Sequence, residues 1–152
     1  MHYLTVQDML WLNLQLTGSE QEFDFAELEE ATFLQYAYHG SKDLTKQAAR
    51  FLTGFKKKEP FTTGNDACAF IGAVAFLEAN GQSFELVDEK GNEWLEGVWS
   101  DPSVAQDAIK AKLSEGHVHT KHGVPNFHEI CEEVIDRYSA TLSSLAVETV
   151  EA

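Results

Sequence analysis

Apolar side chains recur every three or four residues along most of the chain, and this spacing predicts helices rather than strands. A first helix begins after the capping sequence Thr5 to Asp8 and ends at Gly18. A second begins after Asp24 and ends near Gly40, and a third begins near Ser41 and runs up to Lys58. The first third of the chain is therefore expected to form amphipathic helices that each bury one face.

The segment at about 65–80 differs because it is apolar on nearly every side. Ala67 to Leu77 is an uninterrupted run of eleven residues without a charged or polar side chain. A membrane-spanning helix needs about 20 such residues, so this run is too short for one. A helix without a polar face must be surrounded by other helices. We therefore predict an all-α bundle of about six to seven helices around a buried central helix at 65–80.

The second half of the chain continues the helical pattern, with one irregular stretch. The segment 83–87 is short and is expected to be extended. Further helices are predicted over Glu89 to Trp99 and from Asp101-Pro102 to near Leu113. Residues 116–125 form a His-rich loop. A final helix is predicted to begin at Asn126 and to continue through Leu142.

Length and charge restrict the functional classes. The 152 residues suit one domain, and 11 Lys and Arg against 25 Asp and Glu give a formal charge of −14. Such a surface repels nucleic acid, whose affinity for proteins comes mainly from Lys and Arg. The opening Met1-His2-Tyr3 has no signal-peptide pattern. We expect a cytoplasmic protein that binds neither nucleic acid nor membrane.

The connection from Glu59 to Asn65 leads directly into the apolar helix. A Gly-Asn turn at a helix N-terminus presents free N–H groups that favour an anion. The residues of this candidate anion- or nucleotide-binding loop are Phe61, Thr62, Thr63, Gly64 and Asn65. In the alternative, the turn only starts the helix, and Asp66 satisfies the N–H groups itself. Lys56 to Lys58 either stabilise the last turn of a helix through its dipole or attract an anion to the neighbouring loop.

Two motifs in this part of the chain resemble the Fic/Doc family in its short Doc-type branch ("death on curing"). They are Pro-Phe-x-x-Gly-Asn at 60–65 and Phe-Leu-x-x-Asn-Gly at 76–81, preceded by a helix that opens Leu4-Thr5-Val6-Gln7-Asp8. The resemblance covers roughly residues 4–113. It implies a Fic/Doc-like helical domain over 1–115, with the His-rich loop and C-terminal helix of 116–152 packed on it.

Members of this bacterial family transfer AMP or a phosphoryl group from a nucleotide to a protein hydroxyl, and Doc toxins work with an antitoxin partner. Three residues match the family motif, and the resemblance implies a core anchor for Phe61, a close backbone approach to phosphate for Gly64 and a phosphate hydrogen bond for Asn65. Four positions depart from it. The catalytic His, the metal-binding acid and the two basic residues of the family fall at Glu59, Thr63, Asp66 and Ala67.

These departures remove the groups on which phosphoryl-type transfer depends, namely a base, a metal ligand and cations for the phosphates. The leading hypothesis is therefore a catalytically degenerate protein that derives from a toxin–antitoxin system, needs no cofactor, and acts by binding a protein partner or by self-association. The alternative is a divergent transferase that uses ATP or another nucleotide with Mg²⁺. In that case Glu59 acts as the base, which requires burial that raises its pKa.

A second alternative rests on the His-rich loop. His117, His119 and His122 lie within six residues, and His-x-His on an extended segment places both rings on one side, as Zn²⁺ or Ni²⁺ sites require. This pattern predicts a metal-responsive module. The competing interpretation is a solvated loop without a metal.

Overall fold

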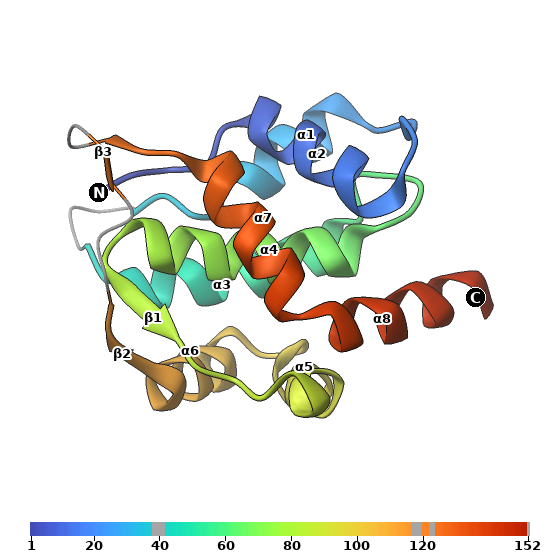
Figure 1. Cartoon of the computed structure of the whole chain (residues 1–152). Coiled ribbons are helices and arrows are strands. Elements are labelled where there is room, and N and C mark those ends of the chain that lie inside the picture. The colour runs from blue at the N-terminus through green and yellow to red at the C-terminus, as the bar shows by residue number, and fades with distance from the viewer. Residues whose placement is uncertain (38–41, 117–119, 122–123, 152) are drawn as a thin grey trace.

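The computed structural model describes residues 1–37, 42–116, 120–121 and 124–151, and of residues 120–121 and 147–151 only the backbone is described. Helices dominate this part of the chain (Figure 1). The eight α-helices are α1 (Val6–Thr17), α2 (Phe25–Phe33), α3 (Leu44–Lys58), α4 (Asn65–Ala79), α5 (Gly91–Val98), α6 (Pro102–Lys112), α7 (Phe127–Arg137) and α8 (Ser139–Glu151). The prediction of an all-α protein is confirmed.

The strands in the described residues are short. β1 (Gln82–Phe84) pairs antiparallel with β2 (Leu113–Glu115), and Ser83 lies opposite Ser114. β3 (Thr120–Lys121) pairs antiparallel with β4 (Val124–Pro125). The β1–β2 pair ties the end of the central helix to the end of α6, in the stretch where the sequence predicted extended character.

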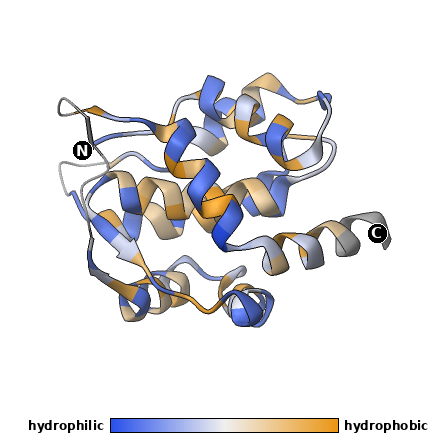
Figure 2. Cartoon of the chain, viewed as in Figure 1, coloured by the Kyte–Doolittle hydropathy of each residue, from blue (hydrophilic) through white to orange (hydrophobic). Residues whose placement is uncertain are grey.

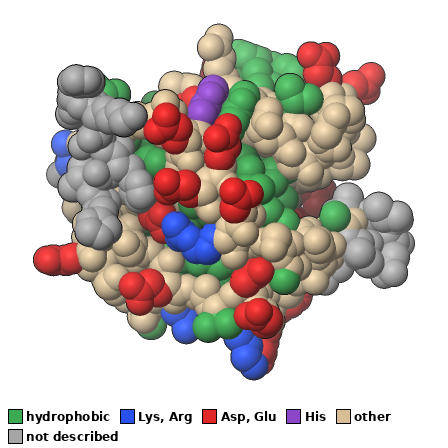
Figure 3. Space-filling model, viewed as in Figure 1, with side chains coloured by type: hydrophobic (Ala, Val, Ile, Leu, Met, Phe, Trp, Pro, Cys, Tyr) green, Lys and Arg blue, Asp and Glu red, His purple; other side chains and the backbone are tan. Residues whose placement is uncertain are grey.

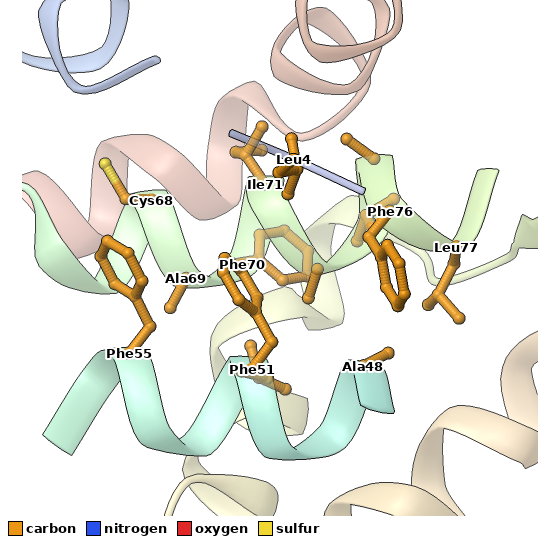
Figure 4. Close-up of a cluster of buried hydrophobic side chains, with 14 of the residues drawn as sticks. Leu4, Ala48, Phe51, Phe55, Cys68, Ala69, Phe70, Ile71, Phe76 and Leu77 are labelled. Atoms are coloured by element: carbon orange, nitrogen blue, oxygen red, sulfur yellow. The ribbon is translucent and has the colours of Figure 1, made fainter. Parts of the chain in front are cut away.

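Helix α4 lies at the centre, and every residue from Cys68 to Ala79 is buried. Helices α1, α3, α7 and α8 all contact it, and Figure 2 shows apolar residues along most of its length. Phe51 and Phe55 of α3 point toward its first turns (Figure 4). At Gly72 an added Cβ atom would lie 2.8 Å from Cε1 of Phe51, so the small residue permits this close approach. The predicted central helix at 65–80 is confirmed.

Two predicted helices have different bounds. The second was expected to reach Gly40, which lies outside the described residues, but α2 ends at Phe33. The buried side chain of Gln35 bonds both the N–H and the C=O of Leu4, each at 2.7 Å. This attachment to the N-terminal segment replaces further helical turns. The helix predicted over Glu89 to Trp99 begins instead with a 3₁₀ turn, η1 (Asp88–Lys90), before α5.

The predicted final helix is two helices, and the chain bends at Tyr138. This residue leaves helical geometry at φ −114° and ψ 36°. Its fully buried ring packs edge-on against Phe70 of α4, with the ring centroids 5.0 Å apart. Burying a large aromatic ring at this point fixes the bend and directs α8 back toward the start of α4.

The carboxylate of Asp88 caps the start of α8 from a distant part of the sequence. It accepts the N–H groups of Ala140 and Thr141, both at 2.9 Å, and the Thr141 hydroxyl at 2.8 Å. Burial alone would raise the pKa of Asp88, but these hydrogen bonds to the ionised form outweigh burial and hold the pKa below its ordinary value.

Replacing Asp88 by alanine is expected to lower the free energy of unfolding by about 1 kcal/mol at neutral pH, the usual effect of losing a cap. Because the folded-state pKa lies below the unfolded value of about 3.9, the carboxylate stabilises the fold above about pH 4 and loses its effect as the pH falls through the folded pKa. Urea unfolding followed by circular dichroism should therefore show the two proteins converging below about pH 4. A difference that stays constant with pH would contradict this role.

Within the described residues, no helix combines the length and the apolar character that crossing a membrane requires.

Candidate functional site

The candidate loop connects α3 to α4 and turns through two residues with left-handed backbone geometry. Glu59 has φ 48° and Gly64 has φ 83°. At Gly64 an added Cβ atom would lie 2.7 Å from Cγ2 of Thr17 and 2.9 Å from Nδ2 of Asn13. Both the backbone angle and the close approach of α1 therefore require glycine at this position.

The side chain of Asn65 closes the loop from inside. Its Oδ1 accepts the Phe61 N–H at 3.0 Å, and its Nδ2 donates to the Phe61 C=O at 2.8 Å. The Phe61 ring is buried and lies 6.4 Å from the ring of Phe55 in α3, centroid to centroid. The polar groups of Asn65 and of the Phe61 backbone are thus bonded to each other across the loop.

A second set of contacts holds the loop to the connection between α1 and α2. The Thr62 N–H donates to the Glu22 C=O at 3.0 Å, and the Asp24 N–H donates to the Pro60 C=O at 2.9 Å, so the two segments run antiparallel. The Thr63 hydroxyl donates to Oε1 of Gln21 at 3.1 Å. Thr63 therefore uses its hydroxyl hydrogen in a contact within the protein.

Asn13 of α1 also binds the loop. This buried side chain donates through Nδ2 to the Thr63 C=O at 3.0 Å and lies 3.6 Å from Sγ of Cys68. Sequence reasoning did not identify Asn13 or Gln21 as part of the site. The only signal in the sequence is a polar amide, Asn13, on the face of α1 that also buries Met9 and Leu12.

The charged residues around the loop pair with one another. Nζ of Lys56 lies 3.0 Å from both carboxylate oxygens of Asp66. Nζ of Lys58 lies 2.9 Å from Oε2 of Glu30 and 3.7 Å from Oε2 of Glu27. Two of the three lysines thus serve acids of the protein itself. These pairs favour the structural interpretation of the lysine cluster over an attraction for an incoming anion.

Glu59 has an exposed side chain at the end of α3. The alternative in which Glu59 serves as a base required its carboxylate to be buried. That requirement is not met. Ala67, at the other end of the motif, lines a cavity and contributes only a methyl group to it.

This cavity lies beside the first turn of α4 and has a volume of about 250 Å³. Its lining comes from α1, the loop, α4 and α8. The described residues around it are Leu16, Thr17, Thr63, Gly64, Ala67, Leu142, Leu145 and Ala146. No charged side chain is among these described residues, and Gly64, the N-cap residue of α4, makes no side-chain cap hydrogen bond. The space next to the loop is therefore mainly apolar.

The predicted metal ligands His117, His119 and His122 lie outside the described residues. In the described part of the chain, no group of three or more His, Cys, Asp or Glu side chains is arranged to hold a metal ion. Burial raises the pKa of the Cys68 and Cys131 thiols to about 12, so both are protonated at neutral pH. Thiols in this state are neither nucleophiles nor metal ligands.

Comparisons of the chain with protein-family models, with curated proteins and with solved structures gave no match. The resemblance to the Fic/Doc family therefore rests on the sequence motifs at 60–65 and 76–81.

Proposed function

We propose that this chain is a catalytically degenerate Fic/Doc-like protein, which acts by binding a protein partner or a second copy of itself and derives from a toxin–antitoxin system. One observation carries the proposal: the polar side chains left in the loop are bonded within the protein. The Asn65 amide is bonded to Phe61, and the Asp66 carboxylate is bonded to Lys56.

The positions that match the family motif lack the side chains that nucleotide transfer requires. An attacking hydroxyl needs a base that titrates near neutral pH, Mg²⁺ prefers carboxylate oxygens, and a polyphosphate needs cations. The corresponding groups are an exposed carboxylate at Glu59, a hydroxyl at Thr63 that donates to Gln21, and a negative charge at Asp66. Lys56 is engaged in the ion pair with Asp66, so Asp66 brings no net positive charge to a triphosphate. A chain with this loop can bind a partner but lacks the groups for nucleotide transfer.

Calorimetry with ATP and related nucleotides, with and without Mg²⁺, is expected to show no binding at millimolar concentrations. Incubation of a bacterial lysate with ATP labelled at the α- or γ-phosphate is expected to label the same proteins with and without the chain. The matched control is Glu59→Ala, which changes one exposed side chain. If the wild-type chain labels a protein and Glu59→Ala does not, the divergent transferase is correct and binding alone is not the function.

A further inference from the structure

Two exposed phenylalanines stand together where α1 connects to α2. The side chain of Phe23 is 43% exposed and that of Phe25 is 60% exposed. They flank Asp24, the extended residue at the N-cap of α2. We name Phe23 and Phe25, together with the neighbouring acids Glu20, Glu22 and Asp24, the Phe23–Phe25 surface.

The exposure of these rings is unfavourable in the isolated chain. Burying a phenylalanine stabilises a protein by about 1.5–3 kcal/mol, and exposed apolar patches often mark interaction sites. Helix α2 buries its other face through Leu28, Ala31 and Thr32. Phe33, at the far end of α2 and outside this buried stripe, is 38% exposed. Eight residues separate it from Phe25, which places exposed apolar side chains about 12 Å apart along the helix.

The charge around these rings has one sign. The first 41 residues contain seven Asp and Glu and no Lys or Arg. Lys58 approaches Glu27 and Glu30, but within the described residues no ion pair neutralises Glu20, Glu22 or Asp24. Figure 3 shows hydrophobic and acidic side chains side by side at the upper edge of the molecule, above α1 and α2.

The negative charge of Glu20, Glu22 and Asp24 determines which kind of molecule can bind the Phe23–Phe25 surface. A second copy offering the same surface would bring like charges together, and nucleic acid or an anionic membrane would be repelled for the same reason. We infer that the Phe23–Phe25 surface binds a basic amphipathic segment of a protein partner. Apolar side chains of that segment cover Phe23 and Phe25, and its Lys or Arg side chains face Glu20, Glu22 and Asp24.

The position of the surface connects it to the candidate loop. Phe23 pairs with Phe61 through an antiparallel bridge, and their ring centroids lie 6.0 Å apart. A partner bound here therefore rests on the segment that holds the degenerate loop in place. The inference rests on the proposed function, because it names the class of partner that a chain acting by binding would take.

The test measures fluorescence anisotropy of three labelled peptides titrated with the full chain. The first has Lys and Leu arranged as an amphipathic helix, the second has the same composition in shuffled order, and the third is oligolysine of the same charge. The wild-type chain is expected to bind the first peptide most tightly. Phe25→Ser should weaken that binding about tenfold, the effect of leaving one phenylalanine unburied, and should leave oligolysine binding unchanged.

Two further variants complete the test. Val104→Ser changes an exposed apolar residue of α6, on the opposite side of the molecule from α2, and should leave all affinities unchanged (Figure 1). Glu22→Gln should weaken binding of the amphipathic peptide and reduce its dependence on salt. Thermal unfolding of each variant verifies that the fold is intact.

Two results would overturn the inference. One is equal affinity of wild type and Phe25→Ser for the amphipathic peptide. The other is a dimer in sedimentation analysis that Phe25→Ser dissociates, which would make a second copy the occupant. Neither result bears on nucleotide transfer, and labelling of a protein by wild-type chain but not by Glu59→Ala would refute the proposed function without involving Phe25. The two failures are therefore distinguishable.

Discussion

Replacing Arg137 by methionine is expected to lower the free energy of unfolding by about 3 kcal/mol, because it removes the cation that makes two hydrogen bonds to a buried carboxylate. Arg137 makes two hydrogen bonds to Glu78, with Nη2 3.0 Å from Oε1. The Glu78 side chain is only 3% exposed, and Arg137 is 38% exposed. The effect falls at the low end of the range for buried pairs, since water can reach the Arg137 side of the contact.

The position of Glu78 in its helix adds to this dependence. It lies in the last turn of α4, which contains no basic residue, so the helix dipole disfavours its negative charge. The Phe84 N–H contributes one long contact, 3.4 Å from Oε2. Arg137 therefore supplies two hydrogen bonds and a positive charge to a carboxylate that the helix dipole disfavours.

Urea unfolding monitored by circular dichroism would measure the change, and thermal unfolding should show a midpoint lower by about 6–12 °C. The control is the double variant Glu78→Leu with Arg137→Met, which removes both charges and should recover most of the lost stability. A loss below about 0.5 kcal/mol in Arg137→Met would place the pair among ordinary surface ion pairs and contradict this argument.

The sequence was most informative where a signal and its consequence lie within a few residues. Thr5 and Asp8 form both bonds of the expected capping box, and Asp24, Asp101 and Asn126 cap the helices they were predicted to begin. The uninterrupted apolar run from Ala67 to Leu77 identified the central helix, because only a surrounded helix can be apolar on every side. These features depend on local hydrogen bonding and on burial alone.

The remaining features depend on contacts between distant residues. The bend at Tyr138 follows from packing on Phe70, and α2 ends early because Gln35 binds Leu4. Asp88 caps a helix that begins 51 positions later, at Ser139. The periodicity of the sequence does not reveal such partners. The second helix was therefore predicted too long, and the bend at Tyr138 in the final helix was not predicted.

The candidate site divides in the same way. The motif placed the residues of the loop together and gave Gly64 its conformational role. It could not decide whether the Asn65 amide binds a phosphate or the backbone of Phe61, since the same two groups suit both. The bonds to Phe61 and the lysine pair of Asp66 become apparent only when α1, α3 and the loop are placed around one another.

Placing the residues of the Fic/Doc motif in the loop is expected to strengthen ATP binding at least about hundredfold in the presence of Mg²⁺. A hydrogen bond to a charged group contributes about 1.5–3 kcal/mol. A hundredfold change in affinity requires about 2.8 kcal/mol. A lysine and an arginine that each bind a phosphate oxygen together exceed this value. Removing the Asp66 carboxylate also releases Lys56 from its ion pair. The substitutions are Glu59→His, Thr63→Asp, Asp66→Lys and Ala67→Arg.

Asn65 and Phe61, which are bonded to each other in the wild-type loop, are kept in this variant, and the control isolates the effect of net charge. The control carries the same change in net charge at exposed positions of α6, through Asp107→Lys and Ser103→Arg, far from the loop. Calorimetry should show tight binding only for the restored loop. If both variants bind ATP equally, the loop is not a phosphate-binding frame, and the resemblance to the Fic/Doc family does not extend to its site. Binding confined to the restored loop would instead show that the frame persists and that its charges were lost.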